Sequence, residues 1–241
     1  MNKNTWEKFA GVRKRFKSFV AELDSSFPQL RDIQQKLVDN RAEISYKIET
    51  PVVYNSALDE VTSESEIRLI LVGDNPGRRE QEAENRRYLV GPSGKIARKF
   101  FSDNPSLKID FTKNVIILNK TPIHTPRTND LRHLALYLEE SQIKMADLLL
   151  EFQETLGAPV FITGYSEMRK GGIFEAYTER LKRLYQKKQE SRERLLIFRH
   201  FSMNQFTTDL KQKSLPGETV EKTLSRVGKA YRERVFGNAN A

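Results

Sequence analysis

Residues 67–77 read I-R-L-I-L-V-G-D-N-P-G, and this stretch decides the fold class. The apolar run over 67–72 predicts a short buried strand, and the Gly/Asn/Pro cluster over 73–77 predicts a tight turn at its carboxyl end. In open α/β sheets, ligands bind beyond the carboxyl ends of the strands. The turn therefore places the Asp74 carboxylate and the Asn75 amide at a candidate site, although a simple helix-capping turn would use the same residues.

Three more apolar runs repeat this pattern along the chain. They cover 114–118, 159–163 and 195–198, and helical patterns separate them. Strands that alternate with helices indicate a parallel sheet covered on both faces. The sequence therefore predicts a three-layer α/β/α fold with a central four-stranded parallel sheet and N-terminal helices. Residues 1–60 form the predicted helical extension, packed on the core, and residues 61–241 the α/β domain.

Apolar residues at helical spacing predict the main helices. The first covers 5–24, with Asn4 and Glu7 placed as a capping box. A long helix over 130–156 and a final helix over 220–235 each end at a glycine. Polar residues follow each strand, so a parallel sheet would gather them at one edge.

Composition narrows the possible functions. The chain of 241 residues carries 41 Lys and Arg against 32 Asp and Glu, a net charge of +9. This balance favours a polyanionic partner, nucleic acid first and an acidic membrane surface second. The absence of cysteine excludes disulfides, thiolate nucleophiles, iron–sulfur clusters and cysteine–zinc sites. No apolar run is long enough to span a membrane and no signal-peptide core is visible, so we expect a cytoplasmic protein.

Two nucleotide-directed classes fit the chain poorly. A phosphate-binding loop that ends at Gly94-Lys95 would need glycine where Leu89 stands and Ser or Thr where Ile96 stands. The N-K-x-D pattern begun at Asn119 would need Asp where Pro122 stands. Zinc deaminases require cysteine ligands, and the three histidines lack the spacing of a metal site. We therefore predict no bound metal and no cofactor.

Three ordered blocks resemble the uracil-DNA glycosylase superfamily. The first, 73–77, resembles the G-x-N-P-G of the mismatch-specific and single-strand-selective branches, and 87–94 resembles the R-P-F-V-G-x-x-G of the thermophile-type branch. The second block is a strand that ends in Asn119, and the third is a strand that ends in His200-Phe201-Ser202, similar to H-P-S. The resemblance covers residues 65–210.

The resemblance implies a monofunctional DNA glycosylase. Such an enzyme flips a damaged or modified base, uracil by default, out of DNA and hydrolyses its N-glycosidic bond. Asn119 would read the flipped base, and His200 would donate a hydrogen bond to the departing base. Asn75 would position the attacking water, with Asp74 as base or electrostatic partner. No lysine is clearly placed for Schiff-base chemistry, which favours hydrolysis without strand cleavage.

The resemblance also suggests which residues bind DNA. We expect the protein to be a monomer, and its DNA substrate can be single- or double-stranded. Leu89 occupies the position of the base-stacking aromatic, with Tyr88 displaced by one residue, and Phe201 replaces the usual proline. These departures keep two alternatives open: excision of another deaminated or modified base, such as a phage-type base, and a catalytically silent nucleic-acid-binding relative. A hydrolase of free nucleotides is a third class, disfavoured by the missing phosphate loop. The predicted DNA contacts are Arg78, Arg79, Arg87, Ser93, Ser166 and Ser202, with Met203 and Asn204 in the wedge that enters the vacated stack.

Overall fold

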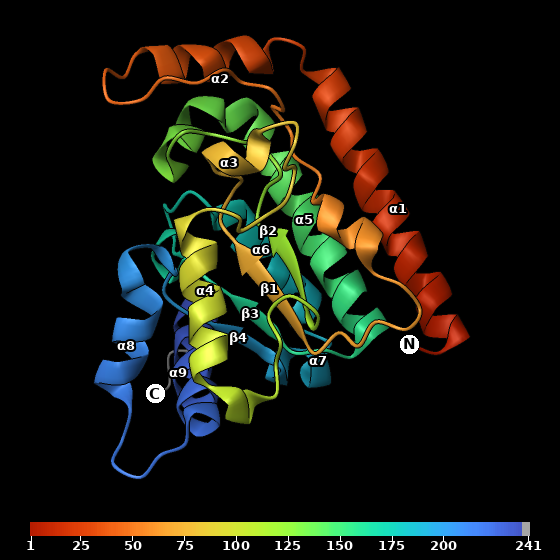
Figure 1. Ribbon diagram of the computed structural model, residues 1–241, viewed down its shortest axis with the longest axis vertical. Coiled ribbons are helices and arrows are strands. Elements are labelled where there is room, and N and C mark those ends of the chain that lie inside the picture. The colour runs from red at the N-terminus through yellow and green to blue at the C-terminus, as the bar shows by residue number, and fades with distance from the viewer. Residues whose placement is uncertain (238–241) are drawn as a thin grey trace.

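A single sheet of four parallel strands lies at the centre of the protein in the computed structural model, which describes residues 1–237 (Figure 1). The strand order is β2-β1-β3-β4, so the chain reverses direction across the sheet after β2. The predicted α/β fold with four parallel strands is confirmed. The strands are β1 (Leu69–Gly73), β2 (Val115–Asn119), β3 (Val160–Ile162) and β4 (Leu195–Ile197).

Burial along the strands explains why each apolar run folds as a strand. Every residue of β1 and β3 is buried, as expected for inner strands covered by helices on both faces. In β2, Val115 and Ile117 are half-buried, because this strand forms one edge of the sheet. Gly73 pairs with Asn119 at the end of the β1–β2 ladder, which aligns the first two polar turns.

Helices cover both faces of the sheet and give the three layers. In Figure 1, α4, α8 and α9 lie on one side of the sheet, and α5 and α6 lie on the other. Aromatic rings pack between the helices of the first group. The ring centroid of Phe206 in α8 lies 5.0 Å from that of Phe100 in α4 and 5.1 Å from that of Phe198, which follows β4. The helices that follow β1 are α3 (Arg78–Gln81), α4 (Pro92–Asp103), α5 (Ala135–Leu156), α6 (Glu175–Tyr185), α7 (Gln189–Glu193), α8 (Gln205–Lys213) and α9 (Val220–Phe236).

Helix ends agree with most of the predicted boundaries. The predicted helix over 130–156 begins as a 3-10 segment, η3 (Thr128–Leu134), and continues as α5. Gly157 ends α5 and Gly237 ends α9, and both adopt the left-handed conformation that favours glycine. Other 3-10 segments are η1 (Ser56–Glu60), η2 (Pro105–Leu107), η4 (Tyr165–Met168) and η5 (Ser202–Asn204).

The N-terminal helices are α1 (Lys3–Ser26) and α2 (Leu30–Asp39). The helix cap predicted at Asn4 is wrong: Asn2 is the cap, and its side chain accepts a hydrogen bond of 2.8 Å from the Thr5 amide. The helix starts earlier because Asn2 offers the same capping oxygen two residues upstream. The buried face of α1 packs on α5, where the Phe9 and Phe152 rings lie 5.5 Å apart.

The segment between α2 and β1 joins the N-terminal helices to the sheet. The Val53 amide donates to the Pro122 carbonyl at 2.8 Å, and Asn55 Nδ2 donates to the Ile117 carbonyl of β2, also at 2.8 Å. One hydrophobic cluster contains buried residues from both sides of the predicted boundary after residue 60. Residues 1–60 therefore pack as a layer of the same core, and the boundary itself stays a prediction.

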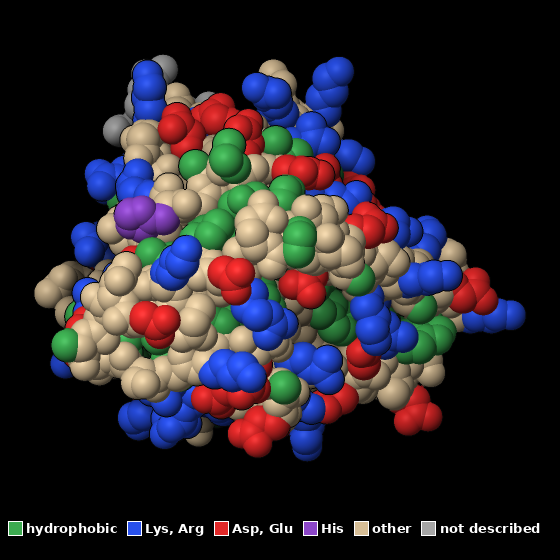
Figure 2. Space-filling view, turned by 90° about the horizontal axis from the view of Figure 1, so that it is seen from above, with side chains coloured by type: hydrophobic (Ala, Val, Ile, Leu, Met, Phe, Trp, Pro, Cys, Tyr) green, Lys and Arg blue, Asp and Glu red, His purple; other side chains and the backbone are tan. Residues whose placement is uncertain are grey.

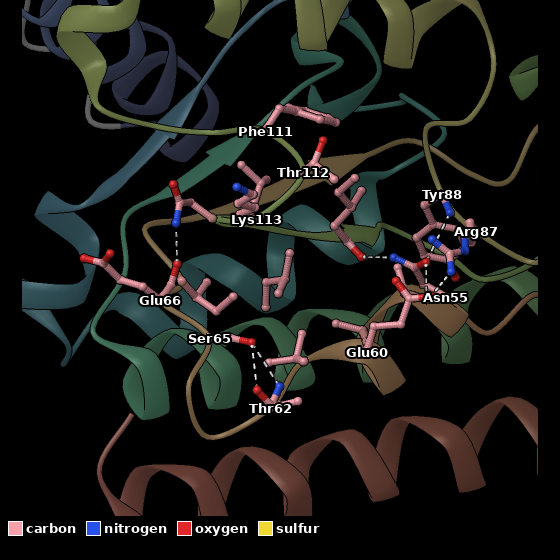
Figure 3. Close-up of a pocket in the computed structure, with 18 of the residues that line it drawn as sticks. Asn55, Glu60, Thr62, Ser65, Glu66, Arg87, Tyr88, Phe111, Thr112 and Lys113 are labelled. Carbon is pink, nitrogen blue, oxygen red and sulfur yellow. Dashed lines mark hydrogen bonds and ion pairs between the residues drawn. The ribbon is translucent and has the colours of Figure 1, made fainter.

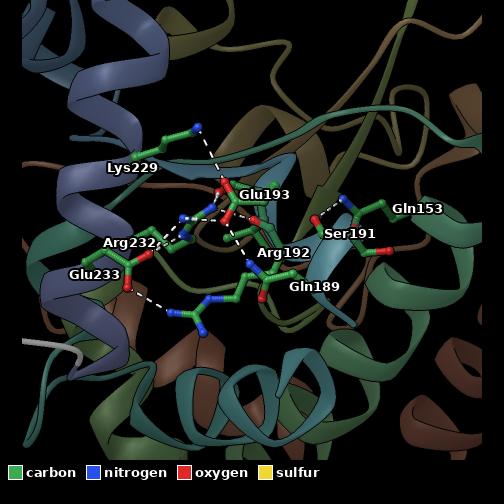
Figure 4. Close-up of polar contacts among 9 residues, drawn as sticks. Gln153, Gln189, Ser191, Arg192, Glu193, Lys229, Arg232 and Glu233 are labelled. Atoms are coloured by element: carbon green, nitrogen blue, oxygen red, sulfur yellow. Dashed lines mark hydrogen bonds and ion pairs between the residues drawn. The ribbon is translucent and has the colours of Figure 1, made fainter. Parts of the chain in front are cut away.

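A buried arginine ties the last helix to the sheet. Arg232 of α9 is 3% exposed, and its guanidinium donates to the carbonyl groups of Arg192 and Leu195. The carboxylates of Glu193 and Glu233 balance its charge at 3.6 and 2.7 Å (Figure 4). A buried charge is tolerated when it is paired and fully hydrogen-bonded, so this network fixes α9 against α7 and β4.

Candidate active site

A cleft of about 390 Å³ lies beyond the carboxyl ends of the strands, next to α3. Its walls include Asp74 and Asn75 after β1, Asn119 at the end of β2, and His200 after β4. These four residues carry the predicted catalytic and base-reading roles, and the fold brings them together from distant parts of the chain. The parallel register explains this convergence, because all strand ends reach the same edge.

The floor of the cleft holds a buried ion pair between Asp74 and Lys120. Lys120 is fully buried, and its Nζ donates to Asp74 Oδ1 at 2.5 Å, to the Thr163 carbonyl at 2.5 Å and to the Gly73 carbonyl at 3.3 Å. Glycine is required at position 164, where φ is +87° and a Cβ would collide with the Asp74 carboxylate. The Asp74 side chain is thereby held in one orientation.

Charges around this pair determine its protonation. Burial acts to raise the pKa of Asp74, but the positive charge of Lys120, together with His200 and the Lys120 hydrogen bond, brings it below its usual value. Burial lowers the pKa of Lys120, and Asp74 offsets part of that effect. The three donors of an ammonium group are all used, so Lys120 orients Asp74 and is not free to attack a sugar. Sequence reasoning missed this residue, although it directly follows Asn119.

The Asn75 amide is fixed by two threonines of the loop after β2. Its Nδ2 donates to Thr125 Oγ1 at 2.9 Å, and its Oδ1 accepts from Thr128 Oγ1 at 3.0 Å. A carbonyl oxygen has two acceptor positions, so Oδ1 retains one for a water molecule. Asn75 can therefore hold a water in the cleft without a further rearrangement of its side chain.

His200 is arranged to donate a hydrogen bond into the cleft. Its Nδ1 accepts a hydrogen bond of 3.0 Å from the Ser202 amide, which places the ring proton on Nε2. Burial lowers the pKa of His200, Lys120 lowers it further, and Asp74 partly opposes both. A neutral imidazole with a proton on Nε2 can stabilise negative charge that develops on a leaving group.

Asn119 brings an unsatisfied donor to the same cleft. The residue is 2% exposed, and its Nδ2 has no hydrogen-bond partner within residues 1–237. A buried donor left unpaired costs about 1–3 kcal/mol, which a bound ligand with a facing acceptor would recover. Gly73 makes room for this side chain, because a Cβ there would lie only 2.5 Å from Asn119 Oδ1.

Leu89 and Glu80 form another part of the cleft wall. Leu89 has a φ of +55°, an unusual value for a bulky residue, and its amide donates to Glu80 Oε1 at 2.8 Å. Glu80 Oε2 accepts from the Gly77 amide at 3.0 Å, so one carboxylate links the first motif to the Leu89 turn. Burial raises the pKa of Glu80 to about 7, against the effect of these amides. Sequence reasoning did not single out Glu80.

The structure does not bring Tyr88 or Arg87 to the cleft, which corrects their expected placement. Tyr88 is 3% exposed and donates its hydroxyl to the Val53 carbonyl at 2.5 Å, and Arg87 pairs with Glu60. Both line a separate hollow of about 580 Å³ beside β2 (Figure 3). The left-handed turn at Leu89 directs the leucine to the cleft, and Tyr88 is held in the core by its hydrogen bond.

The remaining predicted DNA contacts, apart from Met203 and Asn204, divide into two groups. Arg78, Arg79 and Ser93 line the cleft. Ser166 is exposed but lies outside the cleft lining. Ser202 also lies outside it.

Figure 2 views the molecule from above, and Lys and Arg side chains occupy much of the rim of this face, with acidic groups between them.

Met203 and Asn204 form an exposed tip beside His200. Both residues have positive φ, +51° and +57°, and the Met203 side chain is 82% exposed. The neighbouring Phe201, which replaces the expected proline, is fully buried and stacks on Phe206 at 4.2 Å. Phe201 thus anchors the loop in the core and leaves an apolar side chain at its tip.

A histidine outside the cleft connects the N-terminal layer to the first motif. His124 Nδ1 donates to the Pro76 carbonyl at 2.8 Å, and its Nε2 accepts from the Tyr46 hydroxyl at 3.1 Å. Burial lowers the pKa of His124 to about 4, although the Pro76 carbonyl favours the charged form. The Tyr46 ring also lies 5.1 Å from the Arg78 guanidinium, so the N-terminal segment supports the cleft rim.

Comparisons with known proteins give no family assignment: the chain matches no family model and has no significant match to a curated protein. Within residues 1–237, no helix is long and apolar enough to cross a membrane. The same part of the chain holds no cluster of three or more His, Asp or Glu side chains suited to a metal ion.

Proposed function

We propose that this protein is a monofunctional DNA glycosylase that flips a damaged or modified base into the cleft and hydrolyses its N-glycosidic bond. The observation that carries the proposal is the convergence of Asn75, Asn119 and His200 on one cleft. The unpaired Nδ2 of Asn119 adds support, because a flipped base offers carbonyl acceptors for it. The net charge of +9 fits DNA as the partner.

Each of these side chains has a defined part in the reaction. Asn119 binds the edge of the flipped base with its amide. Cleavage of the glycosidic bond leaves negative charge on the base, which the Nε2 proton of His200 stabilises. Water held by Asn75 adds to the sugar carbon as the bond to the base breaks, and its proton passes to solvent or to the departing base. Ionised Asp74 stabilises the positive charge on the sugar; its lowered pKa makes it a weak base.

A second candidate within this class is a glycosylase for a base other than uracil. No Phe, Tyr or Trp from residues 1–237 lines the cleft, and Leu89 stands where the resemblance expects a stacking ring. An aliphatic wall supports a base through contact area alone, so the preference among bases depends on Asn119 and the cleft shape. A catalytically silent DNA-binding relative remains the alternative outside enzymes. We further propose a cytoplasmic monomer that needs no cofactor for this reaction.

The test is release of free base from oligonucleotides that carry a panel of deaminated and modified bases, as single strands and as duplexes. We expect excision of at least one base, and Asn75→Ala should lower the rate by about 10²-fold or more at saturating protein because the water is no longer positioned. DNA affinity should change little. Asn4→Ala, at an exposed asparagine of α1 that does not line the cleft, is the matched control.

Two results would count against the proposal. Absence of any abasic product across the panel, with DNA binding intact, would assign the protein to the silent relatives. Excision that is unaffected by Asn75→Ala but abolished by Asp74→Asn, in a variant that circular dichroism shows to be folded, would assign the water to the carboxylate.

A further inference from the structure

Two tyrosines beside the cleft, whose rings pack against each other at a tilt, are surrounded by a cluster of positive charges. The Tyr165 ring of η4 and the Tyr231 ring of α9 lie 4.3 Å apart. Four cations surround them, and we call these six residues the basic surface. Arg169 lies 5.9 Å from the Tyr165 ring, Lys213 and Arg234 lie 4.9 and 5.8 Å from the Tyr231 ring, and Arg199 Nε lies 3.5 Å from the Tyr231 hydroxyl.

The basic surface has more positive than negative charge. Among residues 1–237, Asp209 is the one carboxylate that forms an ion pair with any of the four cations, with Arg199 at 3.3 Å and with Lys213. The Tyr231 hydroxyl donates to the same carboxylate at 2.9 Å, so Asp209 is fully engaged. Arg169 and Arg234 are exposed and form no ion pair with residues 1–237. Two of the four cations are therefore available to an outside anion.

The fold places this surface directly beside the candidate active site. Arg199 precedes His200 in the chain, and the Tyr165 amide donates to the Phe198 carbonyl at 3.0 Å. Tyr165 follows Gly164, which packs against Asp74. The basic surface thus runs from the ends of β3 and β4, beside the cleft, onto α9.

We propose that the basic surface binds the sugar–phosphate backbone of DNA next to the flipped nucleotide. Arginine presents a planar set of donors suited to phosphate, and regularly spaced phosphates match several cations along one surface. The two tyrosine rings pack against each other at a tilt, and Tyr231 is 4% exposed, so the Tyr231 ring supports the cations and is not open to a base. Only the choice of DNA as partner rests on the proposed function.

The test compares two double variants that each lower the net charge by two. Arg169→Gln/Arg234→Gln changes the basic surface, and Lys8→Gln/Lys187→Gln changes exposed lysines on α1 and after α6. Affinity for a short duplex is measured between about 50 and 200 mM salt, and the slope of log affinity against log salt is compared with that of the unmodified protein. Loss of two phosphate contacts should make the slope shallower by about 1.8, with no such change in the control.

The outcomes separate this proposal from the proposed function. An unchanged slope in the first variant, a slope changed equally in both variants, or no DNA binding by the unmodified protein would overturn the basic surface as a DNA site. Selective loss of binding to phosphatidylserine vesicles, with DNA affinity unchanged, would assign the surface to a membrane. Binding that depends on the surface, without release of any base from the panel, would overturn only the glycosylase assignment.

Discussion

Asp74 and Lys120 show how burial changes the chemistry of a residue. In the sequence, Asp74 is an acidic residue in a turn and a candidate general base. In the structure, Lys120 donates to its carboxylate and keeps its pKa low. A carboxylate in a close ion pair holds its negative charge but takes up protons poorly. The pair therefore favours the electrostatic role that we propose for Asp74 over the role of a general base.

Removal of either partner should be costly. Lys120→Met or Asp74→Asn alone leaves an uncompensated buried charge, and we expect each to lower the free energy of unfolding by about 3–5 kcal/mol. The double variant should lose much less free energy of unfolding than the sum of the two single losses, since it removes both charges. Urea unfolding of the four proteins measures the coupling, and Lys187→Met provides an exposed lysine as control. Strictly additive losses would show that the two side chains do not interact.

At the scale of elements, α2 and the segment after it hold the loop that follows β2. Gln34 of α2 donates to the carbonyl groups of Pro51 and His124 at 3.0 and 2.7 Å. His124 in turn joins Tyr46 to Pro76. Arg41, just after α2, pairs with the buried Asp130 at 2.6 Å. The N-terminal layer therefore positions the loop whose threonines hold Asn75.

The pKa of His124 predicts a loss of stability in acid. An unfolded histidine binds a proton near pH 6.5 and the folded one near pH 4, so between these values the unfolded state holds more protons. The contribution of His124 to the free energy of unfolding is complete above pH 6.5. It is lost as the pH falls toward 4, and the total loss is about 3 kcal/mol. His124→Asn, whose amide can replace the donor to Pro76, should remove about this much of the acid sensitivity.

Urea unfolding at about pH 7 and about pH 4.5 measures this difference, because those values span most of the shift. Glu80 titrates in the same range and changes the stability in the opposite direction. Both proteins contain Glu80, so its effect on the stability cancels in the comparison. His133→Asn, at an exposed histidine, should leave the acid sensitivity unchanged. The same decline in the His124 variant and the unmodified protein would show that this site is not responsible.

At the scale of the whole molecule, one core includes the N-terminal helices and the sheet. Residues 1–60 contribute ten buried apolar side chains to it, among them Phe9, Phe16 and Val53. Burial of each such side chain is worth about 1.5–3 kcal/mol, and complete domains are stable by only about 5–15 kcal/mol. We therefore expect the fold to depend on the first 60 residues.

Deletion of residues 1–60 should abolish cooperative unfolding. The shortened chain would expose the α5 surface that α1 covers and leave the Pro122 carbonyl without its partner, Val53. Thermal unfolding followed by circular dichroism tests this. Phe9→Ala is the milder comparison, and it should keep the transition while it lowers stability by about 3–5 kcal/mol. A cooperative transition in residues 61–241 would instead establish the predicted boundary as a domain boundary.

Much of the fold could be predicted because its signals are local. The four apolar runs, each followed by polar residues, determine the strands, and alternation with helices determines the parallel sheet. The cleft members Asp74, Asn75, Asn119 and His200 follow from the same pattern, since parallel strand ends share an edge. The positions of Tyr88 and Lys120 could not be predicted in this way. They depend on the left-handed φ at Leu89 and on carbonyl groups from other strands.

The sequence of residues 67–77 thus determined two features by itself: a buried strand, and a turn that carries a carboxylate and an amide. It could do so because apolar runs and turn residues act over a few positions. Only the tertiary structure decided what those two groups can do. Lys120 and Gly164 hold Asp74 as a charged group in the floor, and Thr125 and Thr128 fix the orientation of the Asn75 amide. Protonation and orientation depend on neighbours that are distant in the chain, and folding alone brings those neighbours together.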